Sequence, residues 1–105
     1  MIDKKSFIKT LHGERLVWRR HALERMLSRN ISRDNVKKVL KKADIIEDYY
    51  EDSPFPSALF FGYAGGRVLH VIAALDKEEE LIYVITAYEP DIRHFQVDMR
   101  TRKKR

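Results

Sequence analysis

The sequence predicts an α+β domain in which two N-terminal helices pack on one face of a roughly four-stranded antiparallel sheet. Apolar residues recur at helical spacing through the first 42 positions, whereas β-branched and aromatic runs separated by turn residues fill most of the remainder. Helices that precede strands with short, hairpin-like connections are typical of this architecture. We expect one domain over residues 1–99 and a basic disordered tail over residues 100–105, because 105 residues suffice for one core only.

The first helical signal is short. Asp3 is placed to cap a helix with an apolar stripe, and this helix ends before Gly13. Residues 16–18 (Leu-Val-Trp) form a brief extended segment. Ser32 is a good N-cap for a later helix that turns Val36, Val39 and Leu40 inward and its lysines, Lys37 and Lys38 among them, largely outward.

Between these segments, residues 20–29 form the helix that carries the candidate chemistry. At 100° per residue, His21, Arg25 and Arg29 fall on one face. The opposite face collects the apolar residues Ala22, Leu23, Met26 and Leu27. A core side and an exposed, functional side are therefore predicted for one helix.

Four later runs predict strands. They cover residues 45–46, 58–63, 68–75 and 81–88. Gly65-Gly66 indicates a hairpin turn between the second and third runs. If the helices cover one face of this sheet, the other face is left for function.

Composition excludes several classes of protein. The chain has no cysteine, so no disulfide or thiolate metal site is available and a cytoplasmic location is the default. The longest nearly uncharged run, residues 68–75, is too short to cross a bilayer, and no membrane partner is expected. No zinc-ligand spacing or phosphate-binding glycine loop occurs, so we predict no metal and no cofactor.

Charge is divided unevenly along the chain, whose net charge is +5. Residues 1–42 hold 13 Lys/Arg against 4 Asp/Glu, residues 43–99 hold 3 against 12, and residues 100–105 hold 5 against none. A surface so divided attracts polyanions, which makes nucleic acid the first candidate partner. The alternative is that the lysine-rich helix is simply a solvated face.

His21 and His70 are the candidate acid and base. Histidine has an ordinary pKa of about 6.5, which suits either role at neutral pH. His70 interrupts an apolar strand-like run where valine or isoleucine would pack equally well. Considered singly, the two histidines have structural alternatives: His21 as a solvated helix residue and His70 as a hydrogen-bonded core residue. Tyr88, a further candidate at the end of the last predicted strand, could equally be a half-buried aromatic residue of the sheet.

Four stretches of the sequence resemble a known family. They are Trp18-x-x-His21-Ala22-x-Glu24-Arg25-Met26, Arg29-x-Ile31-Ser32, Gly66-Arg67-x-Leu69-His70-Val71 and Ile85-Thr86-Ala87-Tyr88-Glu89-Pro90. Over about residues 14 to 95 the chain is similar to the family catalogued as domain of unknown function 4258. That family is similar to the RelE-like toxins of bacterial toxin–antitoxin pairs, small α+β proteins that cut RNA, often at the ribosome.

The resemblance implies a metal-independent endoribonuclease that uses the 2′-hydroxyl of the RNA. His21, His70, Arg25 and Tyr88 would be catalytic. Arg29 and Arg67 of the matching stretches, together with Lys37 and Lys38 of the basic helix, would bind RNA. The expected partners are RNA, including ribosome-bound mRNA, and a cognate antitoxin. Two alternatives remain open: a non-catalytic module that binds RNA or the ribosome through the same basic surface, and a small protein-interaction domain.

Overall fold

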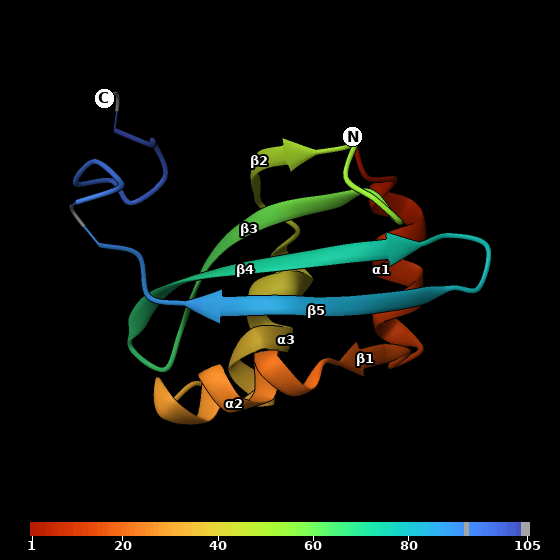
Figure 1. The fold of residues 1–105 in the computed structure, drawn as a ribbon, viewed down its shortest axis with the longest axis horizontal. Helices are drawn as coiled ribbons and strands as arrows, with labels where there is room; N and C mark the ends of the chain where they lie inside the picture. The colour runs from red at the N-terminus through yellow and green to blue at the C-terminus, as the bar shows by residue number, and fades with distance from the viewer. Residues whose placement is uncertain (92, 104–105) are drawn as a thin grey trace.

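The computed structural model describes residues 1–91 and 93–103. Along the chain it contains α1 (Lys4–His12), β1 (Leu16–Trp18), α2 (Arg20–Ser28), α3 (Arg33–Lys42), β2 (Ile45–Tyr49), β3 (Ser57–Ala64), β4 (Arg67–Asp76) and β5 (Leu81–Tyr88). Figure 1 shows the helices behind and beneath the sheet, and residues 93–103 beyond the carboxyl end of β5. The α+β prediction is therefore confirmed.

The sheet has five strands in the order β1-β5-β4-β3-β2, and it is mixed. β1 pairs parallel with β5, whereas the other three pairings are antiparallel. The predicted four-stranded antiparallel sheet was thus one strand short. Residues 16–18 supply the fifth strand, which is too brief to show an alternation pattern and finds its partner far away in the sequence.

Three helices, rather than two, make up the helical layer, because α1 also contributes to the core. Phe7 of α1 is buried and its ring stacks on Phe60 of β3 with centroids 4.8 Å apart. Among helices in the described part of the chain, none has the length and apolar character needed to cross a membrane.

Local capping chemistry explains where α1 and α3 begin. The Asp3 carboxylate accepts a hydrogen bond from the Ser6 amide, 3.2 Å away. Ser32 and Asn35 form a reciprocal capping box, in which each side chain accepts from the other residue's backbone amide. These contacts confirm the predicted helix starts.

The core lies between the helices and the face of the sheet that they cover. α2 contributes Ala22 and Met26, which are buried and one helical turn apart. Leu27 was expected beside them but is 83% exposed. One residue beyond Met26 the helix has rotated by 100°, which turns the Leu27 side chain from the core toward solvent.

A tight hairpin joins β3 and β4, as predicted. Ala64 pairs with Arg67, so Gly65 and Gly66 form a two-residue loop, and both have positive φ (62° and 78°). Such a turn favours glycine because it requires left-handed backbone at both positions.

The helix-free face of the sheet is partly covered by residues 93–103, here called the C-terminal strap. Phe95 and Arg102 form an isolated antiparallel bridge, and Arg100 and Arg102 pair with carboxylates at and just before β2. The tail predicted to be disordered began at residue 100, yet residues 100–103 are in contact with the domain because Asp44 and Glu47 supply matching negative charge. Residues 104 and 105 lie outside the described residues.

Candidate functional site

His70 lies on the helix-free face of β4, opposite Tyr88 of β5, and is completely buried. Its Nε2 is 2.6 Å from the Met99 carbonyl and its Nδ1 is 3.3 Å from the Tyr88 hydroxyl. Because a carbonyl only accepts, Nε2 donates and the neutral ring's Nδ1 accepts from Tyr88. Phe61 and Phe95 pack edge-on around the imidazole.

Burial shifts the acidity of both members of this pair. Burial lowers the pKa of His70, although the hydrogen bond to Met99 and the charge of Glu47 act in the opposite direction. Burial also raises the pKa of Tyr88, against the opposing influence of the nearby Arg102 charge. The folded protein therefore holds a neutral imidazole beside a protonated phenol at neutral pH.

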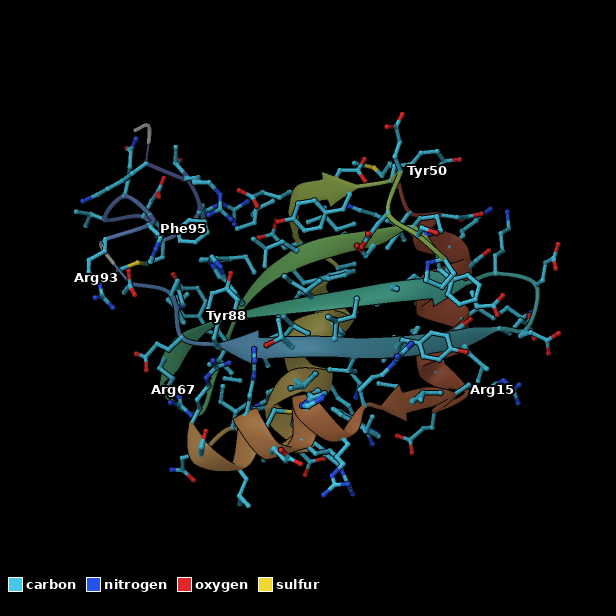
Figure 2. The ribbon with its side chains drawn as sticks, in the orientation of Figure 1. Arg15, Tyr50, Arg67, Tyr88, Arg93 and Phe95 are labelled. Carbon is cyan, nitrogen blue, oxygen red and sulfur yellow. The ribbon has the colours of Figure 1, made fainter. Side chains whose placement is uncertain are left out.

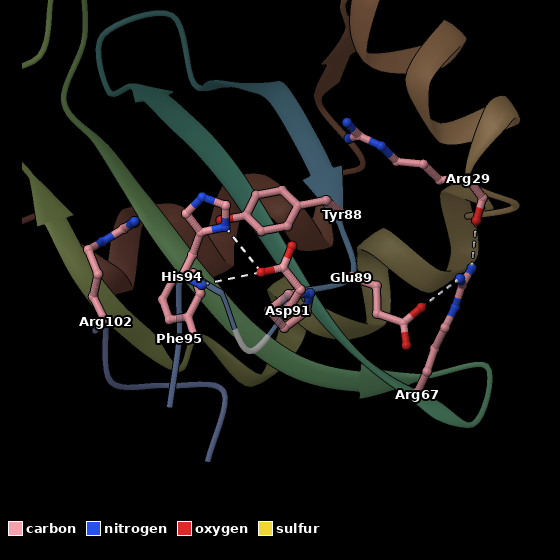
Figure 3. A pocket seen from close by; sticks show the side chains of 9 residues that line it. Arg29, Arg67, Tyr88, Glu89, Asp91, His94, Phe95 and Arg102 are labelled. Atoms are coloured by element: carbon pink, nitrogen blue, oxygen red, sulfur yellow. Dashed lines mark hydrogen bonds and ion pairs between the residues drawn. The ribbon is translucent and has the colours of Figure 1, made fainter. Parts of the chain in front are cut away.

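Figure 2 shows Tyr88 at the end of β5, and Phe95 in the C-terminal strap. Beside Tyr88 there is a hollow where the end of β5 meets the strap (Figure 3). The hollow has a volume of about 530 Å³. Its walls are Arg29, Arg67, Tyr88, Glu89, Pro90, Asp91, His94, Phe95 and Arg102. We call it the arginine hollow.

His94 is the titratable imidazole that lines the arginine hollow. Its Nδ1 is 3.1 Å from an Asp91 carboxylate oxygen, and its side chain is mostly exposed. The same carboxylate oxygen accepts from the backbone amides of Arg93 and His94, so the loop holds Asp91 in place (Figure 3). With Nδ1–H donated to Asp91, Nε2 is the atom left to act as a base.

Three guanidiniums border the arginine hollow with different degrees of constraint. Arg29 donates to the Ala87 carbonyl at 2.8 Å, which uses one of its five N–H groups. Arg67 donates to the carbonyls of Arg29 and Asn30 and pairs with Glu89 at 3.4 Å. It therefore ties the β3–β4 hairpin to the carboxyl end of α2.

Arg102 is the third and most firmly held guanidinium. It pairs bidentately with Glu47 at 2.8 and 2.9 Å and lies 4.7 Å from the Phe95 ring centroid. The hydrogen bond to Arg102 lowers the pKa of Glu47 despite partial burial. Glu47 therefore fixes the place of this cation beside the hollow.

Of the residues predicted to be functional, the structure brings Arg29, Arg67 and Tyr88 together in the arginine hollow. Arg25 is exposed on α2. Lys37 pairs with Glu14 at 3.2 Å, and Lys38 is exposed on α3. These three lie outside the lining of the hollow.

His21 and His70 do not share a site. His21 lines a second hollow together with Ala74, which is four residues further along β4 than His70. At about 3.3 Å per residue this separates the two places by about 13 Å. The two rings predicted to act as acid and base therefore lie at separate sites.

Reasoning from sequence missed Asp91, His94 and Arg102. An aspartate three residues before a histidine, just after the last strand, was a usable signal, since this spacing allows the carboxylate to reach the imidazole. Arg102 could not be found this way, because its place depends on how the strap folds back onto β2.

The described side chains offer no grouping for a metal: no three His, Asp or Glu residues among them gather as metal ligands would. The groups that line the arginine hollow suit an anionic ligand instead. Guanidiniums and a phenol donate hydrogen bonds, and phosphate oxygens accept them.

The fold and this site define an α+β domain with a helical layer on one face of a mixed sheet and a hollow lined by three arginines at the carboxyl end of its last strand. Residues 18–89 match the family described as Domain of unknown function (DUF4258). This match covers more than half of the chain, which therefore belongs to that family. No curated protein and no solved structure matches the chain.

Proposed function

We propose that the protein is a metal-independent endoribonuclease of the toxin type, with its catalytic centre in the arginine hollow. One observation carries the proposal: an aspartate-paired histidine, a phenol and three arginines line a single hollow. These are the groups needed to take a proton, give a proton and stabilise a phosphorane.

In the proposed reaction, the 2′-hydroxyl oxygen attacks the adjacent phosphorus. His94 Nε2 accepts the 2′-hydroxyl proton while the bond from phosphorus to the 5′-oxygen breaks. Asp91 holds the imidazole by its other nitrogen and stabilises the imidazolium that forms. The products are a 2′,3′-cyclic phosphate and a 5′-hydroxyl, so no water or metal enters this step.

Tyr88 is suited to protonate the departing 5′-oxygen. Burial raises the pKa of its phenol, so the proton is present at neutral pH. The hydroxyl's hydrogen bond to His70 is long, at 3.3 Å, and is therefore cheaply exchanged for one to a substrate oxygen. His70 then acts as a positioning residue that fixes the Tyr88 ring from within the fold.

Arg29 is the guanidinium best placed to bind the scissile phosphate. It is held at one N–H by the Ala87 carbonyl, immediately before Tyr88, and keeps further donors for an anion. Charge that builds on the non-bridging oxygens would be stabilised by a donor that is already fixed, which is commonly the largest contribution to catalysis.

The test is cleavage of RNA by purified protein in the presence of EDTA. We expect fragments that end in 2′,3′-cyclic phosphate, and no cleavage of an oligonucleotide with 2′-deoxyribose at every position. His94→Ala and Tyr88→Phe should each lower the rate by about 100-fold or more, the usual contribution of a general acid or base.

His12→Ala is the matched control, because His12 is an exposed histidine on α1, outside the lining of the arginine hollow. It should cleave at the wild-type rate. Intact RNA at high protein concentration, or full activity of His94→Ala, would refute the proposed centre.

A second candidate is an RNA- or ribosome-binding module without catalysis. It is favoured by the exposed basic side of α3, which presents Arg33, Lys38, Lys41 and Lys42. In that case RNA binding would survive His94→Ala and would weaken when Lys38, Lys41 and Lys42 are replaced.

Under the toxin proposal, the expected partners are ribosome-bound mRNA and an antitoxin that covers the arginine hollow.

A further inference from the structure

The second hollow, which contains His21, has no role in the proposed chemistry. It lies on the helix-free face of the sheet, at the opposite end of β5 from Tyr88, and its volume is about 340 Å³. Its walls are Arg19, His21, Asp52, Ser53, Pro54, Phe55, Ala74, Tyr83 and Ile85. We call it the aromatic hollow.

Three flat groups meet at the aromatic hollow. The rings of Phe55 and Tyr83 are nearly parallel, at 5°, with centroids 5.5 Å apart. The Arg19 guanidinium lies 5.1 Å from the Tyr83 centroid. Aromatic rings and guanidinium planes are the groups on which proteins stack unpaired nucleobases.

The other walls suit a nucleobase as well. Ala74 and Ile85 give an apolar floor, and Ile85 is 40% exposed although it is a large aliphatic residue. Asp52 accepts from the Ser57 hydroxyl at 2.7 Å and the Ser53 amide at 3.1 Å, and its carboxylate keeps lone pairs for the amino or imino group of a base.

Charge around the aromatic hollow favours the backbone of the same ligand. Arg19 and Arg20 are exposed at the start of α2, next to His21, and Arg20 also pairs with Glu24 at 2.9 Å. Cations beside a stacking surface are the common arrangement in proteins that bind single strands, where arginine or lysine follows the phosphates and aromatic rings hold the bases.

We propose that the aromatic hollow is a nucleobase-stacking subsite for single-stranded RNA whose scissile phosphate lies in the arginine hollow. This inference rests on the proposed function. Tyr83 and Tyr88 are five residues apart on β5, about 17 Å at 3.3 Å per residue, so the same strand would span both sites. His21 is then a substrate-binding residue rather than an acid or base.

The test measures binding of a probe that cannot be cleaved: a short 2′-O-methyl oligouridylate carrying 5-iodouridine. Tyr83→Leu and Phe55→Leu keep an apolar side chain but remove the flat ring, and His21→Ala removes an exposed imidazole. Each should weaken binding by about tenfold, as loss of a stacking contact does. His12→Ala, the exposed histidine on α1, should bind as the wild type does.

Photocrosslinking of the same probe identifies the stacked residue. We expect crosslinks at Phe55 or Tyr83 that disappear in the leucine variants, while circular dichroism shows that these variants remain folded. Crosslinks confined to residues of the arginine hollow, or wild-type affinity in both leucine variants, would overturn the subsite.

The two proposals fail in different ways. If cleavable RNA stays intact while binding and crosslinking still depend on the aromatic rings, the nuclease proposal is refuted and the stacking subsite is supported. If RNA is cleaved but Tyr83→Leu leaves kcat and KM unchanged on a long single-stranded substrate, the nuclease proposal is supported and the stacking subsite is refuted. With both correct, Tyr83→Leu raises KM about tenfold and leaves kcat unchanged.

Discussion

His70 was singled out because a polar ring interrupts an apolar strand, and the structure gives a physical reason for that interruption. The ring is buried, and both nitrogens have hydrogen-bond partners, Tyr88 and Met99. Valine or isoleucine at this position would leave a phenol and a carbonyl without these partners, a cost that apolar packing does not offset. The sequence pattern correctly indicated that His70 is unusual. Its buried position does not support the direct catalytic role that was predicted for it.

Stability should depend on pH through His70. Burial lowers its pKa in the folded protein below the ordinary value of 6.5, so the unfolded chain binds a proton more readily. As pH falls below about 6.5, the unfolded state gains that proton first and the free energy of unfolding decreases; above that pH this contribution is fully present. Urea denaturation between pH 5 and pH 8 measures the effect.

His70→Gln should lower stability at pH 8 and flatten its dependence on pH near 6. His12→Gln, on an exposed surface, keeps the wild-type profile of stability against pH. An unchanged profile in His70→Gln would show that another group is responsible.

At the level of elements, the strands and helix caps were predictable because their causes are local. Asp3 and Ser32 cap helices through bonds to amides three residues away, and Gly65-Gly66 forms its turn alone. Residues 16–18 were predicted to be extended, but the pairing of β1 and the position of the C-terminal strap depend on partners far along the chain, so no local pattern specifies them. The arginine hollow combines both kinds of element, and for this reason only Arg29, Arg67 and Tyr88 were found beforehand.

The C-terminal strap should contribute to stability mainly through Phe95. A truncation that ends at Asp91 removes this buried ring, which packs on His70, and the Arg100 guanidinium, which lies over Phe61. Loss of one buried phenylalanine lowers the free energy of unfolding by about 2 kcal/mol. Urea denaturation measures that loss, and NMR titration should show the pKa of His70 moving back toward its ordinary value.

Arg100→Ala is the contrasting variant for the strap. The side chains of its ion pair with Asp44 are 42% and 39% exposed, and pairs that solvent reaches contribute little to stability. The variant should unfold close to the wild type. A loss as large as that of the truncation would mean that charge, rather than the Phe95 ring, holds the strap.

At the scale of the whole molecule, the three charge blocks of the sequence are not three separate surfaces. Arg100 and Arg102 of the basic end pair with Asp44 and Glu47 at β2, in the acidic block. The unpaired part of the positive field therefore comes chiefly from the helical layer. No count of charges along the chain could show this, because the neutralisation depends on contacts between distant segments.

The affinity for RNA should fall as the salt concentration rises, because lysines of α3 are expected to contact phosphates. Each lysine that contacts a phosphate of a single strand adds about 0.7 to the slope of log affinity against log salt concentration. Lys38→Ala and Lys41→Ala together should therefore reduce the slope by about 1.4. Fluorescence anisotropy over a series of salt concentrations measures it.

Lys77→Ala is the control for the salt experiment, since Lys77 is an exposed lysine that pairs with Asp3 in a different part of the molecule. It should leave the slope unchanged. Equal slopes in all the variants would place the RNA away from α3.

The parallel pairing of β1 with β5 has a consequence for biosynthesis. Residues 16–18 leave the ribosome early, yet their partners at 82–84 are among the last parts of the domain to be translated. Pairing between such distant segments raises contact order, which slows folding. We therefore expect the nascent chain to reach its final topology only after β5 has cleared the exit tunnel, because β1 has no strand to pair with before then.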